Sequence, residues 1–127
     1  MELDDLTYEI RGCIYDVYKT LGPGLLESVY EEAMIYELDK RELFCENQVS
    51  FPIIYKGKDL KKNLVLDLVV EDSVILELKS VEELKKVHFK QLYTYLKLTD
   101  TRVGFLVNFN VDDILAKGSI NRIVYNY

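Results

Sequence analysis

Histidine, cysteine and tryptophan are scarce in this chain, which has 1 His, 2 Cys and no Trp among 127 residues. A conventional zinc cluster needs about four Cys or His ligands, commonly with a CxxC spacing, which Cys13 and Cys45 lack. Such a cluster is therefore excluded, and both cysteines are predicted to be reduced and structural. The chain also has no run of about 18 apolar residues and no charged-then-apolar leader. We therefore expect a soluble cytoplasmic protein that does not bind membranes.

Positive charge is in deficit, because 16 Lys and Arg stand against 22 Asp and Glu and give a net charge of −6. This balance disfavours non-specific binding to a polyanion, which depends on many phosphate contacts from Lys and Arg. Two local groups of lysines soften that objection: Lys56, Lys58, Lys61 and Lys62, and Lys85, Lys86 and Lys90. They are interpreted either as a phosphate-binding track or as a solvated hairpin tip and a solvated helix face.

The length and the 49% hydrophobic content predict one domain over residues 1–127, with a continuous core. Apolar residues at helical spacing predict helices over about 4–21, 25–38 and 87–98. Strands are predicted over 44–55, 63–70, 74–79, 103–109 and 120–125, and Pro52 favours an edge or irregular position in the first of these. This order predicts an α/β fold with a mixed four- to five-stranded sheet flanked by helices.

Two of the predicted strands carry charges among apolar residues: Asp67 in one, and Glu77-Leu78-Lys79 in the next. Glu77 and Lys79 project to the same side of a strand, because residues i and i+2 share a face. Unpaired buried charges are costly, so the three charges indicate mutual compensation, a bound cation, or both.

The pairing register follows from the same residues. In an antiparallel hairpin, Asp67 lies opposite Glu77 only when paired residue numbers add to 144, which requires an odd loop such as Glu71-Asp72-Ser73. A two-residue loop would put the two acids on opposite faces. The metal-site interpretation therefore predicts a three- or five-residue loop, or a bulge.

Several motifs together resemble a known group of enzymes. Gly24-Leu-Leu-Glu27-Ser-Val-Tyr30 matches the GxxExxY signature of a prokaryotic family, and the hairpin resembles the D…ExK core of the PD-(D/E)XK nuclease superfamily. Gln91-Leu-Tyr-Thr-Tyr95 resembles the QxxxY helix motif of that superfamily, and 103–110 its penultimate strand. Leu66 stands where the superfamily's name has proline, a variable position that is not a metal ligand.

The resemblance implies a restriction-endonuclease-like core and metal-dependent phosphodiester hydrolysis. Asp67 and Glu77 would hold Mg²⁺ or Mn²⁺ through carboxylate oxygens, and the resemblance adds the Leu78 carbonyl and Glu27 as ligands. Lys79 would stabilise the phosphate charge and orient the nucleophile. The alternatives are an ion pair of Lys79 with Glu77 or Asp67, and an exposed first-turn role for Glu27.

Further candidate residues surround this core. His88, Gln91 and Tyr95 share one helical face. Gln91 is a candidate partner of Lys79 or of a metal-bound water, Tyr95 a candidate phosphate ligand, and His88 either a site residue or a capping residue. Tyr30 is predicted to be a packed aromatic whose hydroxyl bonds at the edge of the substrate site.

Three functions remain open on the sequence alone. The first is a Mg²⁺-dependent nuclease for DNA or RNA, monomeric or, by analogy with short nucleases that cut two strands, homodimeric. The second is a non-catalytic nuclease-fold module that binds nucleic acid or protein partners. The third is a hydrolase of small phosphate esters, which suits the acidic composition better than a long duplex does.

Overall fold

The computed structural model describes residues 1–127 as three helices and one five-stranded sheet. The helices are α1 (Leu3–Leu21), α2 (Glu27–Lys40) and α3 (Lys86–Thr99). The strands are β1 (Cys45–Tyr55), β2 (Lys58–Val70), β3 (Val74–Lys79), β4 (Val103–Asn108) and β5 (Ile120–Val124). The predicted α/β fold with a mixed sheet is confirmed.

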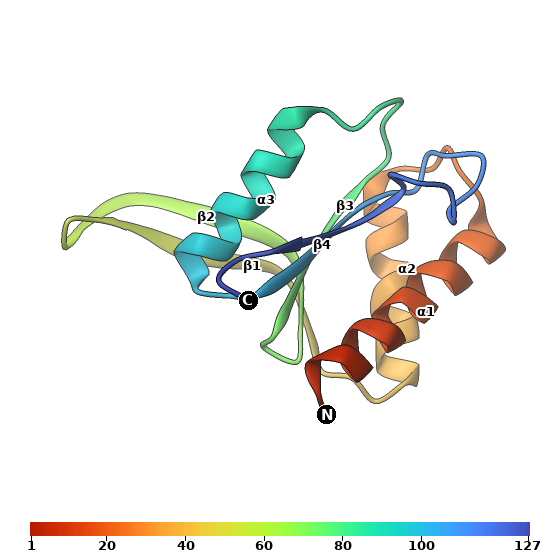
Figure 1. Ribbon diagram of the computed structural model, residues 1–127, viewed down its shortest axis with the longest axis horizontal. Coiled ribbons are helices and arrows are strands. Elements are labelled where there is room, and N and C mark those ends of the chain that lie inside the picture. The colour runs from red at the N-terminus through yellow and green to blue at the C-terminus, as the bar shows by residue number, and fades with distance from the viewer.

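The strands lie side by side in the order β1-β2-β3-β4-β5. Neighbours are antiparallel except β3 and β4, which are parallel and are joined through α3. A parallel pair needs such a crossover, because the chain must return to the same end of the sheet. Figure 1 shows the result: α1 and α2 lie together on one side of the sheet and α3 on the other.

Each face of the sheet has its own core. The face under α1 and α2 buries side chains such as Ile10, Met34, Leu76 and Phe105, and the face under α3 buries Leu66, Ile75, Leu92, Leu96 and Leu106. Residues 74–79 of β3 alternate between these two cores, which explains why this strand is apolar almost throughout. None of the three helices is long and apolar enough to cross a membrane.

A two-stranded arm, residues 52–63, projects from the sheet at the left of Figure 1. Its turn is Lys56-Gly57, where both residues have positive φ. The strand β2 thus begins at Lys58 rather than at residue 63, because strand pairing continues where no core covers it. The predicted irregularity at Pro52 is confirmed, since the register shifts between Pro52 and Ile54 on this edge strand.

Both cysteines are free thiols. Burial raises the pKa of Cys13 and of Cys45 to about 11, so neither is a reactive thiolate near neutral pH. Cys13 lies between α1 and α2, where its sulfur accepts a hydrogen bond from Arg41 Nη1 at 2.9 Å. The same guanidinium bonds Asp16 of α1 at 2.8 Å, so this cluster holds the two helices together.

Candidate active site and metal centre

Asp67 and Glu77 lie where β2 and β3 separate. The register pairs Leu68 with Leu76 and Val70 with Val74, so the strands are joined by the three residues 71–73 and the predicted register is confirmed. Beyond Leu68 the backbone pairing stops. Instead, the Asp67 N–H donates to Glu77 Oε2 at 2.9 Å, and the Leu78 N–H donates to Asp67 Oδ2 at 2.8 Å. The two carboxylates thus occupy the gap between the strands.

Both carboxyl groups have a raised pKa. Glu77 is only 5% exposed, and burial, followed by the charge of Asp67, raises its pKa to about 8 although the Asp67 N–H and the charge of Lys79 oppose the shift. Burial also raises the pKa of Asp67, against the Leu78 N–H and Lys79. A buried acid beside a half-buried one favours binding a proton or a cation.

The backbone of β3 supplies a further oxygen beside these acids. The Lys79 carbonyl faces β4, because it accepts from the Phe109 N–H at 2.9 Å. Backbone groups of successive strand residues point to opposite edges, and the N–H and C=O of one residue point to the same edge. The Leu78 carbonyl therefore faces the β2 side, as its N–H does, so it lies on the same side of β3 as Asp67.

Lys79 lies half-buried on the face that also carries Glu77. Its charge lowers the pKa of Asp67 and of Glu77. The structure forms no direct ion pair between Lys79 and either acid, because all three ion pairs in the molecule involve Arg41. The ion pair of Lys79 with Glu77 or Asp67 is therefore not observed in this arrangement.

The strand β2 is irregular at Asp67 itself. The β1–β2 register pairs Asn47 with Leu68 and Val49 with Leu66, and skips Gln48 and Asp67. Gln48 has a φ of 49°, a conformation that a regular strand excludes. Leu66 and Leu68 consequently face different cores, although residues two apart in a regular strand share a face. This twist turns the Asp67 side chain toward the edge of β3.

The GxxExxY segment is built around Tyr30. This side chain is completely buried and stacks on Phe109 with ring centroids 4.3 Å apart. Its hydroxyl donates to the Gly22 carbonyl at 2.6 Å and accepts from the Leu25 N–H at 3.1 Å. Gly24 has a φ of 93°, which disfavours other residues. Tyr30 therefore braces the loop that leads into α2, and it has no exposed surface with which to contact a substrate.

Glu27 is the first residue of α2 and is exposed. It lines a pocket of about 330 Å³ together with Ser28, Glu31, Gln48, Asp67 and Leu78. Gln48 Nε2 donates to Glu31 Oε1 at 2.6 Å. The sequence did not single out Glu31 and Gln48. The spacing of Glu31 one helical turn after Glu27 is a signal for the first. Gln48 lies at Asp67 because the register of β1 on β2 places these two residues opposite each other, and the sequence did not predict that register.

The predicted residues of α3 lie at different depths. Tyr95 is half-buried, and burial, followed by the charges of Glu77 and Asp67, raises its pKa. Gln91 is exposed one turn earlier on the helix. His88 accepts a hydrogen bond from the Lys85 N–H through Nδ1 at 2.9 Å, so the capping role considered for it is observed. Of these three residues, Tyr95 is thus the one whose pKa is raised in part by the charges of Glu77 and Asp67.

The structure gathers no group of three or more His, Cys, Asp or Glu side chains suited to one metal ion. The predicted convergence of Glu27, Asp67 and Glu77 is therefore not preformed, because Glu77 turns toward the Asp67 N–H and Glu27 lies at the exposed start of α2. The donor chemistry nevertheless fits Mg²⁺ or Mn²⁺. Carboxylate oxygens of Asp67 and Glu77 and the carbonyl of Leu78 are the hard ligands that these cations prefer.

Comparison with curated proteins found no match. A family model of the PD-(D/E)XK nuclease superfamily matches residues 4–123. The matched region extends from α1 into β5 and includes both acids, Lys79 and the α3 residues described above. The chain belongs to the PD-(D/E)XK nuclease superfamily.

Proposed function

We propose that the protein is a metal-dependent nuclease that hydrolyses phosphodiester bonds of DNA or RNA with Mg²⁺, for which Mn²⁺ can substitute. The carrying observation is the reciprocal hydrogen bonding of Asp67 and Glu77, which holds two acids together where burial raises the pKa of each. When both carboxylates are ionised their charges repel each other, and a bound cation would offset that repulsion. Superfamily membership supplies the reaction class.

The metal ligands would be Asp67, Glu77 and the Leu78 carbonyl, with Glu27 reaching the ion from α2. When bound, such a metal polarises the scissile phosphate and lowers the pKa of a water molecule. Loss of the Glu77 proton would favour metal binding, because an ionised carboxylate binds a cation more strongly than a neutral acid does. The Asp67 N–H bonds only Oε2 of Glu77, so Oε1 is the oxygen that would reach the metal.

The remaining roles belong to side chains around the acids. Lys79 would donate to a phosphate oxygen and stabilise the charge that develops there. Tyr95, whose raised pKa keeps its hydroxyl protonated, would donate to a second phosphate oxygen. Gln91 would orient water or the Lys79 ammonium. His88 would keep only Nε2 for the substrate, because Nδ1 caps α3.

We also propose that the chain falls within the GxxExxY family of this superfamily. The segment Gly24 to Tyr30 supports this, since its glycine and tyrosine shape the loop that brings Glu27 to the Asp67 pocket. The glycine and the tyrosine of the motif would then serve to position the Glu27 carboxylate.

The net charge of −6 favours one alternative, a hydrolase of small phosphate esters. Such a substrate would use the same acids but would need no extended basic surface. A non-catalytic binding module is the other alternative, and it would not require Asp67 and Glu77 to bind metal.

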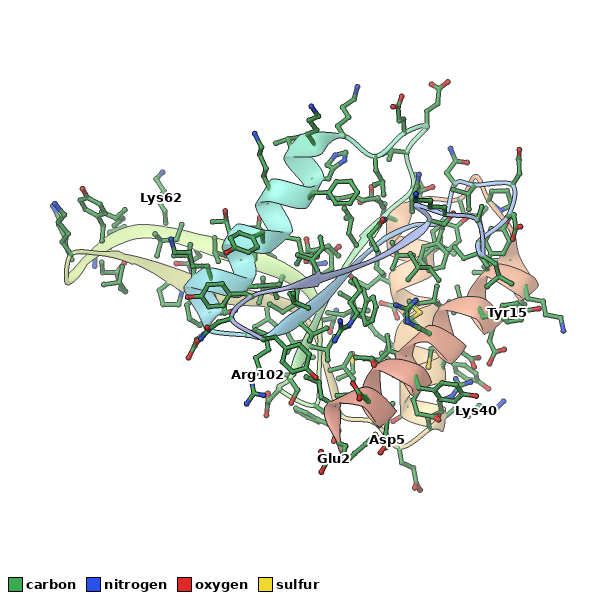
Figure 2. The ribbon with its side chains drawn as sticks, viewed as in Figure 1. Glu2, Asp5, Tyr15, Lys40, Lys62 and Arg102 are labelled. Carbon is green, nitrogen blue, oxygen red and sulfur yellow. The ribbon has the colours of Figure 1, made fainter.

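The test is cleavage of labelled duplex DNA, single-stranded DNA, RNA and small phosphate esters with Mg²⁺ or Mn²⁺. Parent protein is compared with Glu77→Gln and Lys79→Met, and with Glu2→Gln as a matched control, because Glu2 is an exposed acid beside the N-terminus (Figure 2). Polynucleotide cleavage lost in both site variants and kept in the control supports the nuclease. Cleavage of small esters alone supports the first alternative. Equal residual cleavage in all variants indicates a contaminant and contradicts the proposal.

A further inference from the structure

The arm, residues 52–63, is a two-stranded ribbon that starts at the candidate site. Pairing between β2 and β3 covers only Leu68 to Val70 of β2, so β3 supplies no partner for residues 58–67 of β2. The strand runs from the arm directly into Asp67. A lone two-stranded hairpin is only marginally stable in water, so its extension beyond the sheet calls for an explanation other than core packing.

The arm is basic although the protein is acidic. It carries four lysines, Lys56, Lys58, Lys61 and Lys62, against the single acid Asp59, in a chain of net charge −6. All of these residues are exposed. Apolar side chains are exposed among them, with Ile54 53%, Tyr55 58% and Leu60 39% exposed. Basic groups interleaved with an accessible aromatic ring are typical of surfaces that bind a nucleic acid backbone and stack on its bases.

A bulge presents two of the lysines. Pro52 pairs with Asn63 but Ile54 pairs with Asp59, so residues 60–62 of β2 have no partner on β1. Lys61 has a φ of 59°, and its N–H donates to Asp59 Oδ1 at 2.9 Å. Figure 2 shows Lys62 projecting away from the arm. Bulges re-aim side chains, and here the one acid of the arm holds the bulge that exposes Lys61 and Lys62.

We propose that this arm binds the phosphate backbone of a polynucleotide whose scissile phosphate lies at Asp67 and Glu77. The inference rests on the proposed nuclease function and specifies its substrate as a long chain rather than a short nucleotide. The positive charge of the arm complements the negative charge of a phosphate backbone, which is why we choose a polynucleotide as its occupant. A second copy of the protein is the other occupant to be tested, because its net negative charge also attracts a basic arm.

The length of the arm sets the required length of the substrate. Tyr55 pairs with Lys58 at the tip, and the pairs on either side of Gln48 place it opposite Asp67, so the seven-residue step along β1 at about 3.3 Å per residue gives the arm a reach of roughly 23 Å from the site. One strand of a duplex advances about 3.4 Å per nucleotide, so the arm tip meets the backbone about seven nucleotides from the scissile phosphate. A much shorter oligonucleotide cannot contact both places.

The test is binding by fluorescence anisotropy without divalent metal, so that no cleavage occurs. The probes are labelled duplex DNA and RNA of about 30 nucleotides, and the same sequences cut to about six, which is shorter than the reach of the arm. The arm variant is Lys61→Gln/Lys62→Gln. The charge-matched control is Lys40→Gln/Lys117→Gln, two exposed lysines outside the arm and the site, and Lys61→Arg/Lys62→Arg tests rescue.

We expect the arm variant to bind one or both long probes at least about tenfold more weakly, and the slope of log K against log salt to fall by about two. The control and the arginine variant keep the parent's affinity, and binding of the short probes is the same for all proteins. Equal melting temperatures establish that the arm variant is folded.

Two results would overturn the inference. One is an arm variant that binds both long probes as tightly as the control does; Glu77-dependent cleavage in the same protein would then leave the nuclease intact and remove only the arm's role. The other is an arm variant that loses self-association in sedimentation while its binding of both long probes is unchanged. Arm-dependent binding without any Glu77-dependent cleavage would instead support the arm and contradict the nuclease.

Discussion

Asp67 and Glu77 each accept a hydrogen bond from the strand opposite: Glu77 Oε2 accepts from the Asp67 N–H at 2.9 Å, and Asp67 Oδ2 accepts from the Leu78 N–H at 2.8 Å. The carboxylates thereby replace the backbone carbonyls that an unbroken ladder would supply. The acids that the proposed reaction requires therefore also join β2 to β3. Substitutions at these positions should separate the structural role from the chemical one.

The first prediction compares Asp67→Ala with Asp67→Asn. Alanine leaves the Leu78 N–H without an acceptor at a buried position, so we expect the free energy of unfolding to fall by about 1–3 kcal/mol. Asparagine keeps an acceptor oxygen and should lose less stability, yet it should lose cleavage as fully as alanine does. Urea denaturation and the cleavage assay measure the two effects. Equal destabilisation by both substitutions would contradict the role of the hydrogen bond.

The second prediction concerns pH. The pKa of Glu77 rises from an ordinary value of 4.5 to about 8 in the folded protein, mainly through burial. Between these values the folded state binds more protons than the unfolded state, so the free energy of unfolding should fall as pH rises from about 4.5 to about 8. One unit of pKa corresponds to about 1.4 kcal/mol. Thermal melts without metal between pH 5 and 9 measure this fall.

Glu77→Gln should remove that pH dependence. The amide oxygen can still accept from the Asp67 N–H but does not ionise, so the variant should be more stable than the parent above about pH 8 and should lose cleavage. The comparison with the parent also cancels contributions from groups that the two proteins share. If the parent and the variant showed parallel pH profiles, Glu77 would not be the titrating group.

A third prediction tests Lys79. Its charge lowers the pKa of both acids, so Lys79→Met should raise the pKa of Glu77 above its parent value and lower stability at pH 9. Carboxyl chemical shifts followed by NMR during a pH titration measure the pKa directly. Lys90→Met removes an exposed lysine of α3 and is the matched control. An unchanged Glu77 pKa in Lys79→Met would show that the ammonium does not act on the acids.

The fourth prediction tests whether the loop before α2, which Tyr30 holds, contributes to cleavage as well as to stability. Tyr30→Phe removes the two hydrogen bonds that hold Gly22 and Leu25, so we expect a loss of about 1–3 kcal/mol of stability and weaker cleavage through misplaced Glu27. Tyr18→Phe is the matched control, because its hydroxyl donates only to the Val111 carbonyl, at 2.5 Å. The control should lose stability but keep the apparent affinity for Mg²⁺. Equal metal affinity in both variants would make Tyr30 merely structural.

The register of the hairpin was predictable from two acidic positions. Asp67 and Glu77 can meet only with an odd loop, and the observed loop of residues 71–73 meets that condition. Side chains alternate between the two faces of a strand, so an odd or an even number of loop residues decides whether the two acids share a face. The helices and the sequence of elements along the chain were likewise predictable, because their apolar spacing reflects the two cores.

The surroundings of Asp67 were not predictable in the same way. Gln48 lines the Asp67 pocket because the β1–β2 register places it opposite Asp67, and it does so with a positive φ; the residue pattern predicted neither this register nor this conformation. The direction of the Glu77 side chain is set by the free Asp67 N–H, which appears only once the ladder breaks. The extent of β2 toward Lys58 was missed because pairing in the arm leaves both faces exposed and produces no apolar alternation.

The last prediction concerns Gly104 on β4. A Cβ at this position would lie 3.1 Å from the Ile75 carbonyl and from methyl carbons of Leu92 and Leu96. The Ile75 backbone carbonyl cannot yield as a flexible side chain can, and the contacts with Leu92 and Leu96 should push α3 away from the sheet. Gly104→Ala should therefore reduce stability by about 1–3 kcal/mol. Because α3 carries Gln91 and Tyr95, cleavage should fall as well.

Gly12→Ala is the control. The nearest contact of a Cβ at Gly12 is the Arg41 side chain at 3.4 Å, and alanine within α1 should raise the free energy of unfolding by about 0.5–1 kcal/mol. Urea denaturation of the two variants measures both signs, and a Gly104→Ala protein as stable as the parent would mean that α3 does not rest on this strand.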